Sequence, residues 1–254
     1  MKNLCALCQK NTDLQNSHLI PKWAYRRISE LIPDGEVKAP ALISEGKAIV
    51  INKQTTRHLL CAECEQLFSK SEDYVAGLTE FDGGKIKLFN QVNKLDTPRK
   101  VLAALDPGID ADLIARFAAS IFWRGHVMTG DCHLGPYELK FRQYLLGLTD
   151  FPAEIVIHLA IFDESSIVDL RGWVSEPTSR KTGMWWLHGF LLNGLAFRCW
   201  VGKSIPAEWG QVSLGGPNTT KYVSIIKPEE CPDFLAAVEL VGSAKPLGKL
   251  ALPK

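Results

Sequence analysis

The sequence predicts an α+β protein in three parts: an N-terminal cysteine-bearing module, a helical connecting segment and a small β-rich C-terminal domain. Three observations predict this class. Two Cys-x-x-Cys pairs fall near the N-terminus, apolar residues recur at spacings of three and four after residue 110, and apolar runs beyond residue 151 are short and interrupted by Gly and Pro. We therefore expect domains at residues 1–84, 85–150 and 151–254.

Composition identifies a globular chain without naming its activity. The 254 residues are 46% hydrophobic and 22% charged, which indicates a globular chain long enough for two modest domains. The net charge of +1 creates no general attraction for a polyanion, so a nucleic-acid partner would have to bind a local basic patch. Because the sequence shows no signal peptide and no long apolar run, we expect a cytoplasmic protein that does not enter a membrane.

The two cysteine pairs, Cys5/Cys8 and Cys61/Cys64, predict a structural zinc site. Two thiolates separated by two residues in a tight turn can reach one tetrahedral ion, and two such pairs complete a closed site. A cytosolic setting favours zinc over disulfides for these cysteines. Residues 9–60, which are 52 in number, lie between the pairs, so the metal would close a long loop and contribute to folding.

Within the module, we expect a short helix near residues 21–31, a strand at 48–52 and a helix over 62–78. The last of these begins directly on the second cysteine pair, where the helix dipole helps to stabilise thiolates. Treble-clef zinc folds end in such a helix.

The connecting segment is expected to be helical. Asp110 is suited to cap a helix whose apolar residues follow at helical spacing, and a shorter helix is expected over 137–148, after the Gly-Pro pair at 135–136. These helices require no functional explanation.

The C-terminal domain is expected to be a small sheet. Asn193-Gly194 separates two apolar runs and is typical of a β-hairpin turn. The predicted strands are residues 155–162, 183–192, 194–201, 211–214 and 221–226, and residues 242–254 are expected to form a loose tail.

Three sequence elements in the module resemble those of a known enzyme family. They are Cys-Ala-Leu-Cys at 5–8, Ser-His-Leu-Ile-Pro at 17–21 and Leu-Cys-Ala-Glu-Cys-Glu at 60–65. Together they resemble the zinc-bracketed form of the HNH, or ββα-metal, endonucleases. In that family a Cys-x-x-Cys knuckle precedes an Asp-His-x-x-Pro-like element, and a Leu-Cys-x-x-Cys-His element starts the terminal helix. The resemblance covers about the first 80 residues and implies a treble-clef, ββα-metal module there.

The resemblance implies roles for individual residues. His18 falls on the general base, for which a neutral imidazole is suited. Ser17 replaces the metal-binding Asp or His that usually precedes this base, and Thr56 replaces the Asn that orients it. Glu65 replaces the final His. Since a carboxylate can bind Mg²⁺ or Mn²⁺, Glu65 is the implied ligand of a catalytic divalent ion.

Two further residues near this constellation leave alternatives open. Asn52 is the nearest substitute for the missing middle Asn, although its offset differs. Glu72 lies seven residues after Glu65 on nearly the same helical face, where it could act as a second metal ligand or as a salt-bridge partner.

The candidate nucleic-acid surface is the cluster Lys-Trp-Ala-Tyr-Arg-Arg at 22–27. Lys22, Arg26 and Arg27 could contact a phosphate backbone, but the start of an ordinary amphipathic helix explains the cluster about as well.

Three kinds of function therefore remain. The first is a metal-dependent HNH-type endonuclease that hydrolyses phosphodiester bonds in nucleic acid, with DNA favoured. Its C-terminal domain would select substrates, sense a signal or mediate assembly with a protein partner or a second copy. The second is a non-catalytic, zinc-stabilised module that binds nucleic acid through the basic cluster at 22–27. The third is a protein-interaction or regulatory component in which zinc only folds the N-terminal domain. We favour the nuclease for two reasons. His18 lies in the Ser-His-Leu-Ile-Pro element that resembles the family motif, and Glu65 lies where the family has a metal ligand.

Overall fold

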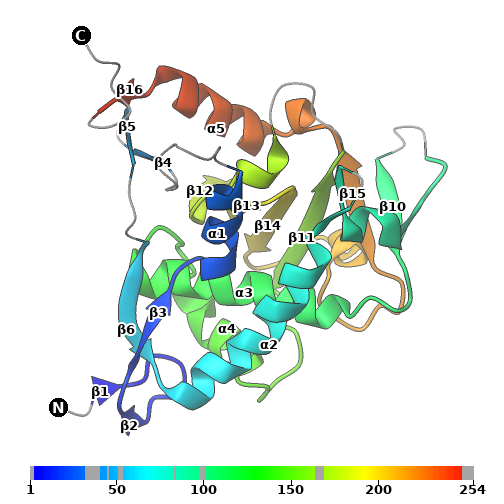
Figure 1. Ribbon diagram of the computed structural model, residues 1–254. Helices are drawn as coiled ribbons and strands as arrows, with labels where there is room; N and C mark the ends of the chain where they lie inside the picture. Colours follow the sequence, from blue (N-terminus) through cyan, green and yellow to red (C-terminus); the bar gives the residue numbers. More distant parts are fainter. Residues whose placement is uncertain are drawn as a thin grey trace.

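The computed structural model describes residues 3–31, 41–44, 46–50, 54–82, 84–97, 101–163 and 169–247. Its largest element is a seven-stranded sheet with the strand order β12-β13-β14-β11-β15-β10-β9 (Figure 1). Neighbouring strands are antiparallel except β11 and β15, which run parallel. The strands are β9 (Val92–Lys94), β10 (Leu102–Leu105), β11 (Ile155–Phe162), β12 (Thr178–Thr182), β13 (Trp185–Leu192), β14 (Leu195–Val201) and β15 (Tyr222–Ile226).

The centre of the sheet follows from local sequence. Asn193 and Gly194 join β13 to β14 with φ angles of 43° and 93°, the left-handed conformations that a tight hairpin turn requires. The expected hairpin is therefore confirmed. All eight residues of β11 are buried, because the strand is covered on both faces, and all of them except His158 are apolar.

Helix α3 (Ala111–Met128) lies between the sheet and helix α2 (Ala62–Leu78) (Figure 1). The Asp110 carboxylate accepts a hydrogen bond from the Leu113 N–H at 3.0 Å, which confirms the expected N-cap. On the sheet side, the Phe122 ring lies 5.1 Å from the Phe190 ring. On the opposite side, the Trp123 ring lies 6.3 Å from the Phe68 ring of α2. The short helix α4 (Glu138–Leu145) packs beside α3.

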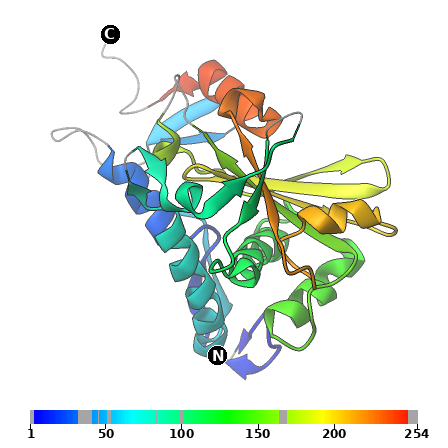
Figure 2. The ribbon, with the colours of Figure 1, turned by 90° about the vertical axis from the view of Figure 1, so that its right-hand side faces the viewer.

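Helix α5 (Pro232–Ser243) covers part of the other face of the sheet, at the top of Figure 2. Its Phe234 ring packs against Phe162 at 5.5 Å and Trp173 at 4.8 Å. Farther along this face, the 3-10 helix η4 (Ala207–Val212) brings Trp209 to within 5.0 Å of Trp185.

The N-terminal module is built around an antiparallel pair, β3 (Gln15–His18) and β6 (Thr56–Leu60). Strand β6 runs directly into α2, so the β3–β6 pair and the helix form one ββα unit. The remaining elements of the module and its surroundings are β1 (Asn3–Leu4), β2 (Asn11–Thr12), α1 (Lys22–Glu30), β4 (Ala41–Ser44), β5 (Lys47–Val50), β7 (Phe81–Asp82), β8 (Lys85–Ile86) and β16 (Lys245–Pro246).

One hydrophobic core joins the three sequence segments. A single cluster of buried residues includes Phe68 of α2, Phe117 of α3 and Phe197 of β14. Within the described residues, no helix is both long and apolar enough to cross a membrane.

Several sequence expectations need correction. Residues 92–105, placed in the helical segment, supply β9 and β10 to the sheet; these strands are too short to show alternation and are stabilised by pairing with the rest of the sheet. Residues 211–214, expected as a strand, continue a 3-10 helix through Val212 because Trp209 packs on the sheet. The expected tail instead holds the end of α5 and β16, which pairs with β5, while residues 248–254 lie outside the described part.

Two histidines are buried in the sheet and are expected to make the fold sensitive to acid. His188 is fully buried, and neither ring nitrogen has a hydrogen-bond partner among the described residues. The ring of His158 contacts Ser224 Oγ at 3.1 Å through Nε2, while its Nδ1 has no hydrogen-bond partner in the part of the chain that the structure describes. Burial, with smaller effects from nearby cationic groups, lowers the pKa of each from 6.5 to about 4.

We expect the free energy of unfolding to fall by about 2 kcal/mol per buried histidine between pH 7.5 and pH 5. The sign follows because the unfolded chain binds a proton near pH 6.5, whereas each folded histidine resists protonation until about pH 4. The contribution of each histidine to the free energy of unfolding is therefore fully present above pH 6.5 and is lost as the pH falls toward 4. Urea unfolding at the two pH values measures the loss. His188→Leu should reduce the pH dependence, and His58→Leu, at an exposed position, should not; equal slopes in the wild type and His188→Leu would contradict this account.

Candidate functional site

The four cysteines of the two pairs converge on one point. The sulfur atoms of Cys5, Cys8, Cys61 and Cys64 all lie within 4.8 Å of one another. The first pair lies on the turn between β1 and β2, while Cys61 precedes α2 and Cys64 lies in its first turn. The Cys61 backbone N–H also donates to Cys5 Sγ at 3.3 Å. This cluster could hold a zinc ion, as its spacing predicts.

The electrostatics of the cluster favour a bound cation. Burial acts to raise the pKa of Cys5, but backbone N–H groups around its sulfur lower the value to about 7. The pKa of Cys64 is raised strongly by burial and by the neighbouring cysteines. Four thiolates cannot be crowded together without a compensating charge, so a metal ion is what would allow all four to ionise.

Beside this cluster, the structure brings together residues from strands β3 and β6 and from helix α2. His18 ends β3 and pairs directly across from Thr56 on β6. Ser17, which is buried, donates a hydrogen bond from its Oγ to Glu65 Oε1 in the first turn of α2. The other carboxylate oxygen of Glu65 has no hydrogen-bond partner in the described part of the chain. Ser17, which precedes the implied base His18, and Glu65, which follows the last cysteine of the cluster, are thus adjacent in space. Asn52 lies outside the described residues.

His18 is held in a setting that favours its neutral form. The residue is half-buried, and burial is the largest cause that lowers its pKa below 6.5. The positive charges of Lys22 and Arg124 lower it further, while Glu72 acts in the opposite direction. A neutral imidazole at neutral pH is the form that can accept a proton.

Glu72 is a salt-bridge partner. Its Oε1 lies 2.6 Å from Nη2 of Arg124, whose side chain is only 2% exposed. The same guanidinium donates through Nη1 to the backbone oxygen of His18 at 2.6 Å. Of the two roles open to Glu72, the structure therefore shows the ion pair. Sequence reasoning missed Arg124, although a charged residue inside an otherwise apolar helical stretch was a signal that could have found it.

The candidate basic surface divides into exposed and engaged residues. Lys22 and Arg26 are exposed, and Arg26 lies 3.8 Å from the Glu30 carboxylate one helical turn away. Arg27 instead donates to the backbone oxygens of Ala76 and Thr79 at the end of α2, at 2.6 and 2.9 Å. A cation there satisfies carbonyl groups that the helix leaves free. Its guanidinium is engaged inside the protein, so Lys22 and Arg26 are the better placed for an external phosphate.

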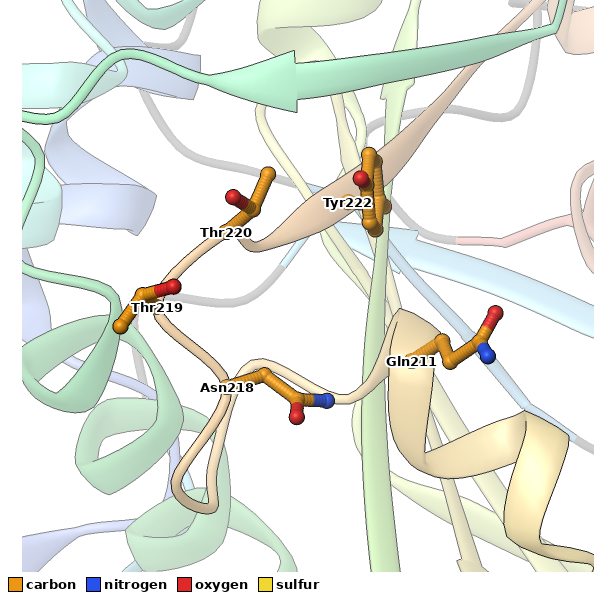
Figure 3. A pocket seen from close by; sticks show the side chains of 5 residues that line it. All are labelled: Gln211, Asn218, Thr219, Thr220 and Tyr222. Carbon is orange, nitrogen blue, oxygen red and sulfur yellow. The ribbon is translucent and has the colours of Figure 1, made fainter.

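An open depression in the C-terminal part is lined only by uncharged side chains (Figure 3). They are Gln211, Asn218, Thr219, Thr220 and Tyr222. None of them belongs to the cysteine cluster or to the residues around His18, and none carries a charge.

Comparison with known proteins finds no matching family model, no matching curated protein and no matching solved structure. A functional interpretation of this chain therefore has to rest on the residues and geometry described above.

Proposed function

We propose that this chain is a metal-dependent endonuclease of the HNH type that hydrolyses phosphodiester bonds in nucleic acid, with DNA as the favoured substrate. One observation carries the proposal: the β3–β6 pair runs into α2 beside a four-cysteine cluster, with His18 at the end of β3 and Glu65 in the first turn of α2. This is the order and placement that a zinc-bracketed ββα-metal module requires. The larger sheet would then serve substrate selection, sensing or assembly.

In this proposal, His18 is the general base. Its neutral imidazole accepts a proton from the water that attacks the phosphorus atom. The lowered pKa of His18 keeps the ring in this form at neutral pH. The backbone of His18 is held by the pairing of β3 with β6.

Glu65 and Ser17 supply hard oxygen atoms of the kind that bind Mg²⁺ or Mn²⁺. A bound divalent ion would provide positive charge to the transition state and to the leaving oxygen. The donor set fits such an ion through one carboxylate and one hydroxyl, although Ser17 brings no charge to the position where the family has a stronger ligand. Glu72 is engaged by Arg124 and is not needed as a ligand in this scheme.

The test of this role is Glu65→Gln. We expect the Mn²⁺ concentration that gives half-maximal cleavage to rise by at least about 10-fold, since losing even an outer hydrogen-bond partner weakens metal sites by 10- to 100-fold. Cleavage of plasmid DNA across a Mn²⁺ titration measures it. Glu63→Gln is the matched control, because Glu63 lies in the same helical turn and is exposed, at 4.0 Å from Lys10. An identical metal requirement in the wild type and Glu65→Gln would remove Glu65 from the site.

The alternative is a zinc-stabilised module that binds nucleic acid without cleaving it. The exposed side chains of Lys22 and Arg26 favour this reading, since they could neutralise phosphates whether or not His18 is catalytic. Salt-sensitive DNA binding without cleavage under any divalent ion would identify this function instead.

A further inference from the structure

Arg124 is a buried cation that joins three elements of the structure. It projects from α3, and its side chain is only 2% exposed. Its guanidinium donates to the backbone oxygen of His18 at 2.6 Å, to Glu72 Oε1 at 2.6 Å and to Ser120 Oγ at 3.1 Å. It also lies over the Phe68 ring, 5.3 Å from its centre. The planar fork of an arginine is suited to bind two such acceptors at once.

Each contact restrains a different part of the candidate site. The bond to the His18 oxygen holds the end of β3, and the ion pair with Glu72 holds the middle of α2. The bonds to Ser120 fix the guanidinium on its own helix. The hydrogen bonds to the His18 oxygen and to Glu72 are both short and have a charged donor, which makes them stronger than ordinary hydrogen bonds. One side chain thus links β3 to α2, in addition to the Ser17–Glu65 hydrogen bond.

We propose that Arg124 is a positioning residue that holds His18 in a fixed position relative to Glu65. The inference rests on the proposed function for its catalytic consequence. Arg124 itself is too deeply buried to touch a substrate, so it acts only through the main chain of His18 and through α2. Since α3 also packs on the large sheet through Phe122, the placement of His18 depends on the C-terminal part of the chain.

Stability alone gives a weak reason for an arginine at this place. A buried ion pair is often no more stabilising than well-packed apolar side chains of similar size. The side chain of Arg124 lies over the Phe68 ring and projects from α3, most of whose residues are buried. An apolar side chain could therefore be accommodated at this position. What an apolar residue could not do is bind the carbonyl oxygen of His18 and Glu72 together.

The first test compares Arg124→Met with Arg116→Met. Arg116 is the control, because it lies on the same helix, pairs with Asp112 at 2.6 Å and donates to the Tyr144 backbone oxygen at 2.9 Å, so these polar contacts are with α3 and α4 and not with the module. We expect Arg124→Met to lower kcat about 10- to 100-fold per zinc-loaded, folded molecule while KM changes less than about 2-fold. Arg116→Met should leave both near wild type. A kcat unchanged in folded Arg124→Met would overturn the proposal.

A second readout does not depend on cleavage. The ring carbon–proton signal of His18 in an NMR spectrum should be single and sharp in the wild type and in Arg116→Met, and multiple or broadened in Arg124→Met. Arg124→Lys covers the case in which the methionine variant fails to fold. Lysine keeps the charge but cannot bind the His18 oxygen and Glu72 at the same time, so this variant should also give a multiple or broadened His18 signal. If the wild type does not cleave, the proposed function fails, while this signal still decides the positioning role. A single sharp His18 signal in both Arg124 variants would overturn it.

Discussion

His18→Ala is expected to reduce the rate of DNA cleavage by at least about 10²-fold while leaving the fold and the zinc content unchanged. General-base catalysis typically contributes factors of about 10² to 10⁴. The fold should survive because His18 is only half-buried and the Arg124 contact uses the main-chain oxygen, which alanine retains. Single-turnover cleavage, a thermal melt and a zinc assay measure the three quantities.

His58→Ala is the matched control for this experiment. His58 lies on β6, two residues from Thr56, and is exposed, with its Nδ1 atom 3.2 Å from the Leu14 backbone oxygen. It should cleave at nearly the wild-type rate. Full activity in His18→Ala, or equal losses in both variants, would show that His18 is not the base.

Cys61→Ser is expected to release zinc and to unfold the N-terminal module. Structural zinc contributes an apparent binding free energy of about 10–16 kcal/mol in small zinc-finger peptides, which is comparable to the entire stability of a typical domain. Cys61 also precedes the first residue of α2, the helix that carries Glu65 and packs on Trp123 through Phe68. Cleavage should therefore be lost together with the metal. Elemental analysis and a thermal melt, with and without a chelator, measure the effect.

The control for the zinc experiment is Cys132→Ala. Cys132 is fully buried and its pKa is raised to about 12 by burial, so it is a neutral core thiol outside the cluster. This variant should retain one zinc ion per chain even if its stability falls. Retention of one zinc ion per chain by Cys61→Ser would show that the ligand assignment is wrong.

The local features of the fold could be predicted because they depend on neighbouring residues. The helix expected at residues 62–78 is α2 with the same bounds, since it starts on a cysteine turn and continues through strong helix formers. The Asp110 cap and the Asn193-Gly194 turn were likewise confirmed. The convergence of the four cysteines followed from their spacing alone.

The features that could not be predicted depend on contacts between distant residues. Strands β9 and β10 exist because β15, more than 100 residues later, pairs with β10. Arg124 reaches His18 across 106 positions of sequence, and no spacing rule connects the two. Arg27 resembled a phosphate-binding residue until the structure showed its guanidinium at the C-terminal end of α2. In each case, tertiary packing determines what the residue contacts.

The most direct test of the central claim is a time course of cleavage on supercoiled plasmid and on single-stranded DNA, with Mg²⁺, Mn²⁺ or a chelator. The proposed function predicts nicked or fragmented products from the wild type that require the divalent ion and disappear in His18→Ala. Absence of products from zinc-loaded wild type with both ions and both substrates, or cleavage that persists in His18→Ala, would contradict it.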